Sequence, residues 1–216
     1  MQKLASLLIA VCLLAAACGS SEPGVKGSGH VVRRQLSLSS FSELDVEQAF
    51  RVRLATGAPQ KVVVRVDDNL ADHLDVGVSG STLHVRLKDV SVSKATLQAE
   101  VSVPSLAKVS LSEASEIDGQ IAVASPLELD LGGASRADLA GTAKTMTVKV
   151  GGSSELGARD LTVGSLTIDL DDSSTAEITV TDELSAGLNG SSSLRYHGSP
   201  RVTRSETHGA SRITRD

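Results

Sequence analysis

A four-residue motif that ends in serine recurs six times in the second half of the chain. The motif reads Ser-Glu-Ala-Ser, Gly-Gly-Ala-Ser, Gly-Gly-Ser-Ser, Asp-Asp-Ser-Ser, Asn-Gly-Ser-Ser and His-Gly-Ala-Ser, and its closing residues are Ser115, Ser135, Ser154, Ser174, Ser192 and Ser211. These serines are 20, 19, 20, 18 and 19 residues apart. A repeat of about twenty residues with small side chains at one fixed position is typical of solenoid proteins.

The residues before each serine alternate between apolar and polar side chains. Three columns, at eight, six and four positions before the serine, are predominantly apolar in the first five repeats, as in Leu127, Leu129 and Leu131. A further apolar column follows the serine by two residues and consists of Ile117, Ala137, Leu156, Ala176, Leu194 and Ile213. A period of two indicates strands with one buried face. We therefore expect an all-β fold, a single-stranded parallel β-solenoid (β-helix) of about 19–20 residues per coil, with at least two strands and one sharp bend in each coil.

The motif itself predicts the bend. The residue before each serine is always Ala or Ser, at positions Ala114, Ala134, Ser153, Ser173, Ser191 and Ala210. We interpret this column as a tight corner in which a larger side chain would clash, and the preceding Gly-Gly or Asn-Gly as the source of a positive φ angle. The six closing serines then form the structural corner of the repeat.

The polar columns between the apolar ones describe the outer wall. Stacked coils would place Lys108 beside Glu128, and Lys149 between Asp130 and Asp169. Opposite charges on neighbouring exposed strands stabilise by a few tenths of a kcal/mol each. We expect this wall to make many weak contacts with a polymeric partner, mainly through Glu128, Asp130 and Asp169.

The last repeat departs from the pattern. Its three inward positions carry hydroxyl side chains, Thr203, Ser205 and Thr207. A solenoid has to end in a polar layer, because an open apolar edge would pair with another chain. We therefore expect a polar C-terminal cap near residues 202–216.

The N-terminus predicts a secretion signal. Residues 1–17 contain one lysine and an apolar run that is shorter than the roughly 20 residues of a membrane span. The run up to Cys18-Gly19 resembles the lipobox of bacterial lipoproteins, although Ala15 stands where leucine is preferred. That resemblance implies a diacylated Cys18 and outer-membrane rather than inner-membrane retention, and we expect no cofactor. An ordinary signal peptide with a chance cysteine is the alternative; Cys12 is a poor lipidation site because Val11 precedes it.

The composition narrows the class of partner. Loss of residues 1–17 removes Lys3 and takes the net charge from −5 to −6, which argues against nucleic acid as a partner. With Cys12 cleaved off and Cys18 lipidated, the remaining domain contains no disulfide. Residues 18–30 are rich in Gly and Ser and predict a flexible tether between membrane and domain.

Residues 31–103 contain further alternating runs without the serine motif. We interpret them as earlier coils of the same stack, which gives about ten coils over residues 31–216 and a rod of roughly 50 Å at the strand spacing of about 4.8 Å. Phe41-Ser42-Glu43-Leu44-Asp45-Val46, Val64-Arg65-Val66-Asp67-Asp68-Asn69-Leu70 and Gly80-Ser81-Thr82-Leu83-His84-Val85, together with the serine repeats, resemble the head GIN domain family. That resemblance implies a single β-solenoid domain on bacterial surface proteins and lipoproteins, described as adhesins of unknown function. It supplies no catalytic residue.

Metal and cofactor signals are weak in the sequence. The five histidines are scattered and form no zinc-binding spacing. The clusters Asp67-Asp68-Asn69 and Asp169-Asp171-Asp172 are the best metal candidates, but turn formation explains each of them better, since Asp and Asn bond their own backbone at bends. We therefore expect no catalytic, cofactor-binding or metal site.

The enzyme alternative is a parallel β-helix that cleaves or de-esterifies polysaccharides. Its acidic cluster would be Asp130, Asp169, Asp171 and Asp172, but Lys149 interrupts this column. Regular coil spacing leaves no room for long loops that would build a sugar cleft. With only Phe41, Phe50 and Tyr196, the chain also has few aromatic platforms on which sugars stack. The sequence favours a non-catalytic cell-envelope lipoprotein with a structural or adhesive role, whose partner is a cell-envelope polymer or a surface protein.

Overall fold

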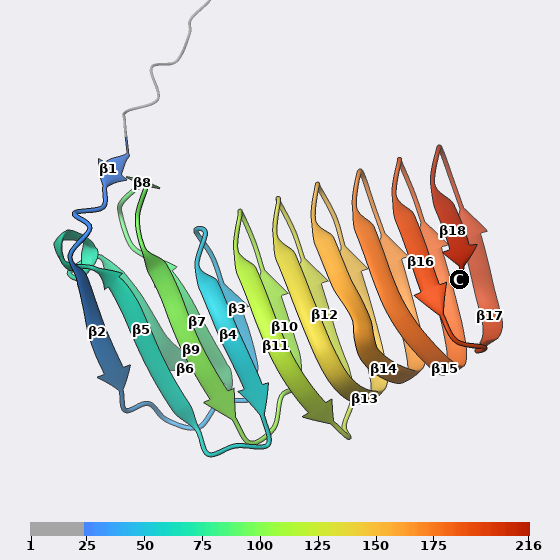
Figure 1. Cartoon of the computed structure of the whole chain (residues 1–216), viewed down its shortest axis with the longest axis horizontal. Coiled ribbons are helices and arrows are strands. Elements are labelled where there is room, and N and C mark those ends of the chain that lie inside the picture. Colours follow the sequence, from blue (N-terminus) through green and yellow to red (C-terminus); the bar gives the residue numbers. More distant parts are fainter. Residues whose placement is uncertain (1–23) are drawn as a thin grey trace, which may run out of the picture.

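The computed structural model describes residues 24–216, which fold into a rod of stacked strands (Figure 1). The strands are β1 (Val25–Lys26), β2 (Val31–Leu36), β3 (Glu43–Val46), β4 (Arg51–Thr56), β5 (Lys61–Asp67), β6 (Leu74–Ser79), β7 (Thr82–Leu87), β8 (Val92–Ser93), β9 (Leu97–Val103), β10 (Lys108–Leu111), β11 (Glu116–Val123), β12 (Leu127–Leu131), β13 (Arg136–Val150), β14 (Glu155–Leu170), β15 (Thr175–Leu188), β16 (Ser193–His197), β17 (Arg201–Thr207) and β18 (Arg212–Arg215). One short 3₁₀ helix, η1 (Asp68–Leu70), interrupts them. No helix within these residues is long and apolar enough to span a bilayer.

The rod has two faces joined at the serine motifs. Face A is formed by β7, β3, β10, β12, the C-terminal halves of β13, β14 and β15, and β17. Face B is formed by β9, β4, β11, the N-terminal halves of β13, β14 and β15, and then β16 and β18. All these neighbours pair in parallel, and from β10 onward the chain completes about five regular turns. The β-solenoid expected from the repeat is therefore confirmed.

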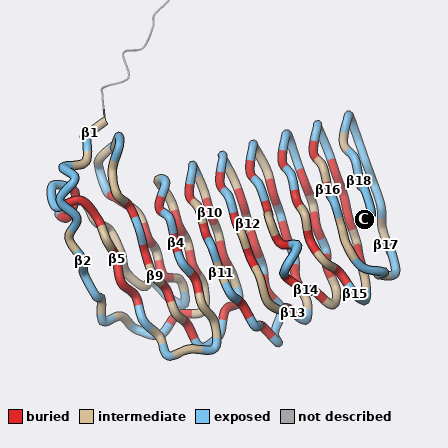
Figure 2. The backbone as a smooth tube through the Cα atoms, viewed as in Figure 1, coloured by how far each residue is buried: buried red, intermediate tan, exposed pale blue. Residues whose placement is uncertain are grey.

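The apolar columns form the core between the two faces. Leu129, Val148 and Ile168 stack on face A with at most 1% of their surface exposed. Ile117, Leu156 and Leu194 project inward from face B and are buried to the same degree. Burial alternates with exposure along most of the length of β11 to β14 (Figure 2). Each buried Leu or Ile contributes about 1.5–3 kcal/mol, so the core follows directly from the period of two.

The strand register of face A is the one that the sequence predicts. Lys108 pairs with Glu128, and Lys149 lies between Asp130 and Asp169. In-register stacking of a turn of about 19 residues brings equivalent side chains to the spacing of neighbouring strands, about 4.8 Å.

The corner differs in one respect from the prediction. The column before the serine is exposed at Ala114, Ala134 and Ser153, so the prediction of a steric limit at these positions is wrong. The buried residue is the closing serine, at most 1% exposed in five motifs. The serine lies four residues after one inward column and two residues before the next, so it is in phase with the alternation and points inward, while its neighbour points to solvent.

Two features of the backbone hold each corner. The second residue of every motif has a positive φ angle, between 61° and 77°. The hydroxyl groups of Ser115, Ser174, Ser192 and Ser211 donate to a carbonyl of a neighbouring turn, with Ser174 Oγ 3.0 Å from the carbonyl oxygen of Val150. Ser135 instead donates to Ser154 Oγ at 3.3 Å. The buried hydroxyls thus satisfy their hydrogen bonds between turns, as buried polar groups must.

The N-terminal part is not a continuation of the regular stack, so the prediction of about ten successive coils is wrong. β2 pairs with β5, β5 with β9 and β6 with β7, all antiparallel. The turn Gly80–Ser81 joins β6 directly to β7, and a two-residue turn reverses the chain within one face rather than carrying it round the core. These antiparallel strands close the end of the rod opposite β17 and β18 (Figure 1).

Residues 24–30 are docked rather than free, which corrects the expected tether over residues 18–30. β1 pairs in parallel with β8. The buried Asp67 carboxylate accepts from the backbone amides of Gly29 at 2.9 Å and Thr96 at 2.7 Å. Gly27 lies against this carboxylate, since a Cβ atom there would be 2.3 Å from Asp67 Oδ2. Glycine in this segment therefore lets the backbone lie close to the Asp67 carboxylate, and it does not make the segment a flexible tether. Residues 1–23, with the expected signal peptide and Cys18, lie outside the described part.

The last turn is exposed almost throughout, as a polar end layer requires. Ser205 and Thr207 stack on Ala186 and Leu188 as expected. A register shift places Val202, and not Thr203, beside Leu184, and leaves Val202 45% exposed.

Candidate functional site: a groove on face B

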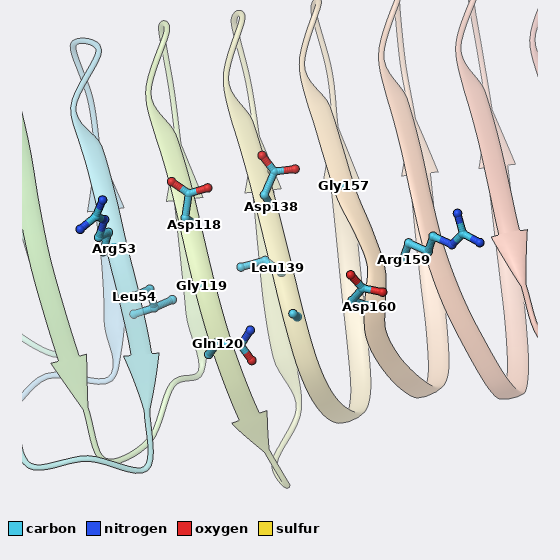
Figure 3. A pocket seen from close by; sticks show the side chains of 11 residues that line it. Arg53, Leu54, Asp118, Gly119, Gln120, Asp138, Leu139, Gly157, Arg159 and Asp160 are labelled. Atoms are coloured by element: carbon cyan, nitrogen blue, oxygen red, sulfur yellow. The ribbon is translucent and has the colours of Figure 1, made fainter.

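A groove with a volume of about 710 Å³ lies on face B (Figure 3). It crosses β4, β11, β13 and β14. Its lining residues are Arg53, Leu54, Asp118, Gly119, Gln120, Asp138, Leu139, Ala140, Gly157, Arg159 and Asp160. We call it the face B groove.

Strand register assembles the middle of the groove. Arg53, Asp118, Asp138 and Gly157 occupy paired positions on four successive strands. They all point outward, because they alternate with the buried column of Ile117 and its equivalents. Gly157 leaves this column without a side chain, and the Asp138 carboxylate extends over it: a Cβ atom at Gly157 would lie 2.3 Å from Asp138 Oδ1.

An irregularity in β14 supplies the end of the groove. Ala158 pairs with Ile178 and Thr162 with Thr179, so β14 carries three extra residues at this point. Arg159 and Asp160 lie in this bulge and are exposed. Bulges re-aim side chains at the surface of a sheet. The sequence contains a trace of this feature, because the turn from Ser154 to Ser174 spans 20 residues and the next turn only 18.

The charges of the groove are partly neutralised from its rim. Arg136 bonds Asp138 at 2.7 Å and Glu155 at 2.6 Å, and its hydrogen bond to Asp138 raises the pKa of the Arg136 guanidinium. Within residues 24–216, no ion pair involves Arg53, Asp118, Arg159 or Asp160. The groove thus offers cationic and anionic groups that form no ion pair within the described part of the chain, on a bed that includes the buried Leu54 and Leu139.

Face A contains a second hollow of about 650 Å³, near the wall predicted from the sequence. Its acidic residues are held by neighbours: Asp130 by Lys108 at 3.1 Å, Asp169 by Arg204 at 3.1 Å, and Asp171 by the Asn189 amide at 2.9 Å. Asp172 is used differently, since its carboxylate accepts from the backbone amide of Gly152 at 3.0 Å. The acidic cluster singled out in the sequence is therefore a set of separate surface bonds rather than one reaction centre.

The other cluster, Asp67-Asp68-Asn69, bonds to the N-terminal segment. Besides the contacts of Asp67, the Asn69 side chain accepts from the Ser28 amide and donates to the Lys26 carbonyl, both at 3.0 Å. The Ser28 hydroxyl donates to Asp68, and this bond lowers the pKa of the Asp68 carboxyl. The bond from the Asn69 amide to the Asp68 carboxylate, at 2.8 Å, is the local contact that turn formation predicts, whereas the other bonds of this cluster hold the distant N-terminal segment.

Neither groove contains an aromatic side chain among its lining residues. Phe41 and Phe50 are buried, and Tyr196 packs against the core. The lining residues of both hollows therefore offer hydrogen-bonding and charged groups, but no aromatic ring for stacking.

Sequence reasoning located the wall of face A but missed the face B groove. The columns assigned from the sequence cover the strand before each serine, but only one column after it, that of Ile117 and its equivalents. The outward residues beyond that point, such as Asp118 and Asp138, alternate with the apolar column and could have been assigned to a second wall. The bulge that completes the groove depends on the pairing of β14 with β15.

Comparison with known proteins identifies relatives by fold. A protein from Bacteroides fragilis described as a "putative adhesin" superimposes with a TM-score of 0.70 at 17% identity, over 89% of this chain and 100% of that one. A "putative lipid binding protein" from Parabacteroides distasonis gives a TM-score of 0.54 at 17% identity, over 89% and 99%. A "putative adhesin" from Parabacteroides merdae gives 0.50 at 16% identity, over 90% and 100%. At such identities these structures show a shared fold alone, and no curated protein matched the chain.

A family model covers most of the described residues. The model named "Putative auto-transporter adhesin, head GIN domain" matches residues 40–200, which include every strand from β3 to β16. This range contains the face B groove and five of the six serine motifs. The chain therefore belongs to the head GIN domain family of adhesin-like proteins.

Proposed function

We propose that this protein is a non-catalytic, lipid-anchored adhesion or interaction protein of the cell envelope, and that the face B groove holds an extended polar polymer. The observation that carries this proposal is the groove itself, in which charged side chains from four successive strands line one open channel. Asp138 is paired with Arg136, whereas the side chains on the other three strands form no ion pair within residues 24–216. A polymer with repeating hydroxyl, amide or charged groups fits a surface whose own groups repeat at the strand spacing of about 4.8 Å. Once one unit of the polymer is bound, its neighbouring units are held close to the groove, so many weak contacts together give strong binding.

The shape of the rod supports display from a membrane. β1 lies at one end of the rod, and β17 and β18 lie at the other (Figure 1). An anchor attached at Cys18, before β1, would leave both faces accessible along the whole length. Two acyl chains suffice for stable anchoring.

The wall of face A is the less suitable surface. Its carboxylates are engaged by Lys108, Arg204 and Asn189, so a ligand would have to displace bonds that the protein already makes. We therefore propose face B, rather than the wall of Glu128, Asp130 and Asp169, as the contact surface.

Binding to envelope fractions tests the groove. The variant Asp118→Asn/Asp138→Asn removes two charges from the face B groove, whereas Asp130→Asn/Asp169→Asn removes two from face A and serves as the matched control. We expect the face B variant to lose most of its binding to isolated cell walls and outer membranes, and the control to bind like wild type. Equal binding by both variants would contradict the assignment of the groove.

Fractionation tests the anchor separately. We expect Cys18→Ser to move the protein from the membrane pellet to the soluble fraction, while the purified variant keeps its circular dichroism spectrum. A variant that remains in the pellet would show that the lipid anchor is wrong. Release of soluble sugars from envelope polysaccharides, lost in Asp118→Asn, would replace the adhesion proposal with the enzyme alternative.

A further inference from the structure

A mixed cluster of metal-ligating side chains lies near the C-terminal end of the rod, on face B. Glu177 comes from β15, His197 is the last residue of β16, and Asp216 follows β18 directly. One ligand atom from each residue lies within 4.8 Å of the other two. None of these residues lines the face B groove.

Parallel stacking explains why these residues meet. Glu177 pairs with Arg195 and Thr179 with His197, so the two side chains project outward from neighbouring strands two positions apart. Asp216 continues β18, and its backbone amide donates to the Tyr196 carbonyl at 3.0 Å. Three consecutive turns thus contribute one ligand each, from positions that are 20 and 19 residues apart in the chain.

The ligand types match a divalent transition metal. An imidazole nitrogen and two carboxylate oxygens are a donor set that zinc accepts, with water in the remaining position. Zinc bonds of about 2.0–2.2 Å separate tetrahedral ligands by about 3.4 Å. Because Glu177 and Asp216 are exposed by 39% and 43%, their side chains have room to close from 4.8 Å to that distance.

The site is partly organised in advance. His197 Nε2 lies 2.8 Å from Glu177 Oε1, and the imidazole is only 17% exposed. Arg195 is the competing cation: its guanidinium lies 3.4 Å from Asp216 Oδ2, and both side chains are about half exposed. An exposed pair of this length contributes little, so a divalent ion can displace it.

We infer that Glu177, His197 and Asp216 form a zinc-type metal site that ties the last turn of the solenoid to the two turns before it. No sequence motif indicates this site, because its residues are about twenty positions apart in the chain. A metal there would act structurally, since β18 pairs with only one other strand, β16.

Zinc titration of the full chain in mild detergent, after removal of metals with EDTA, tests the inference. We expect one Zn²⁺ per chain by calorimetry and a cobalt spectrum with intense visible bands when Co²⁺ is used as the probe. Each of Glu177→Gln, His197→Ala and Asp216→Asn should weaken Zn²⁺ binding by at least about tenfold, as loss of even an outer-shell partner does.

His84→Ala is the matched control. His84 Nδ1 lies 3.3 Å from the Asp45 carboxylate, but this pair belongs to no group of three ligands within residues 24–216. This variant should bind Zn²⁺ like wild type. Arg195→Met should bind more tightly, because a cation next to the metal is removed, and a gain of affinity cannot result from misfolding.

Hydrogen exchange gives an independent readout. Zn²⁺ should slow exchange at the backbone amides of β18 in the wild type and leave it unchanged in His197→Ala. Absence of Zn²⁺ binding, or affinities of the three ligand variants equal to that of wild type, would overturn the inference. Equal or weaker binding by Arg195→Met would place the metal elsewhere and overturn it as well.

Discussion

The corner of the repeat predicts that Gly152 is among the residues least tolerant of substitution in the rod. Its φ angle is +71°, and a Cβ atom would lie 2.4 Å from the carbonyl oxygen of Gly133 in the preceding turn. That oxygen accepts a hydrogen bond of 2.8 Å from the amide of Ser153. Alanine at this position is therefore strained by its own conformation and also pushes apart two stacked corners.

The cost of Gly152→Ala follows from these two effects. The left-handed conformation costs a non-glycine residue about 1–2 kcal/mol. Displacement of the Gly133 carbonyl weakens one hydrogen bond between turns, which adds about 0.5–1.5 kcal/mol. We expect the free energy of unfolding to fall by about 1.5–3.5 kcal/mol, equivalent to roughly 3–14 °C in Tm for a chain of this length.

Urea and thermal unfolding followed by circular dichroism measure this loss. The matched control is Ser153→Leu, one residue further along, where the side chain is exposed and we expect a change within about 0.5 kcal/mol. If Ser153→Leu were as destabilising as Gly152→Ala, the corner would be limited by the column before the serine after all. The close stacking of Gly152 on Gly133 would then not limit the corner.

Two further predictions concern strain and pH. Glu113 occupies the position equivalent to Gly152 with a φ angle of 61°, so Glu113→Gly should raise stability by about 0.5–1 kcal/mol, which the same unfolding curves would show; a loss would refute strain at this residue. The pKa of Glu43 is lowered from its ordinary value of 4.5, first by a hydrogen bond from Thr82 and then by one from Ser81. A carboxyl whose pKa is lowered in the folded state stabilises the protein above pH 4.5, and this stabilisation is lost as the pH falls through the folded pKa. Glu43→Gln should therefore lose less stability than wild type between pH 5 and about pH 3. Identical profiles of stability against pH would contradict the assignment.

Much of the fold could be predicted from the sequence, because it depends on local alternation. In a strand, each side chain points opposite to its neighbours, so the columns of Leu129 and Ile117 had to be buried once the segments were strands. The constant spacing of the serine motifs then fixed the register, and Lys108 lies beside Glu128 as expected. These conclusions do not depend on the path of the backbone outside one turn.

The bend and the first half of the chain were harder to predict. At the motif, Ser154 is in phase with the inward columns four residues before and two residues after it, so alternation already favours its burial over that of Ser153. The close stacking of one corner on the next, such as Gly152 on Gly133, depends on packing between turns. Alternating runs before residue 104 look the same in parallel and antiparallel pairing. The two-residue turn at Gly80–Ser81 and the docking of Gly27 on Asp67 settle the path there.

The surface sites depend on the tertiary structure alone. The serine motif and the apolar columns determine by themselves that the chain is a solenoid, which residues form its core and which charges share a wall. The face B groove combines residues that strand register brings together with Arg159 and Asp160, which the bulge in β14 displaces relative to the next turn. Glu177, His197 and Asp216 meet only because three turns stack in register. Alternation along a strand is a local property, whereas contacts between turns depend on how many residues each turn contains.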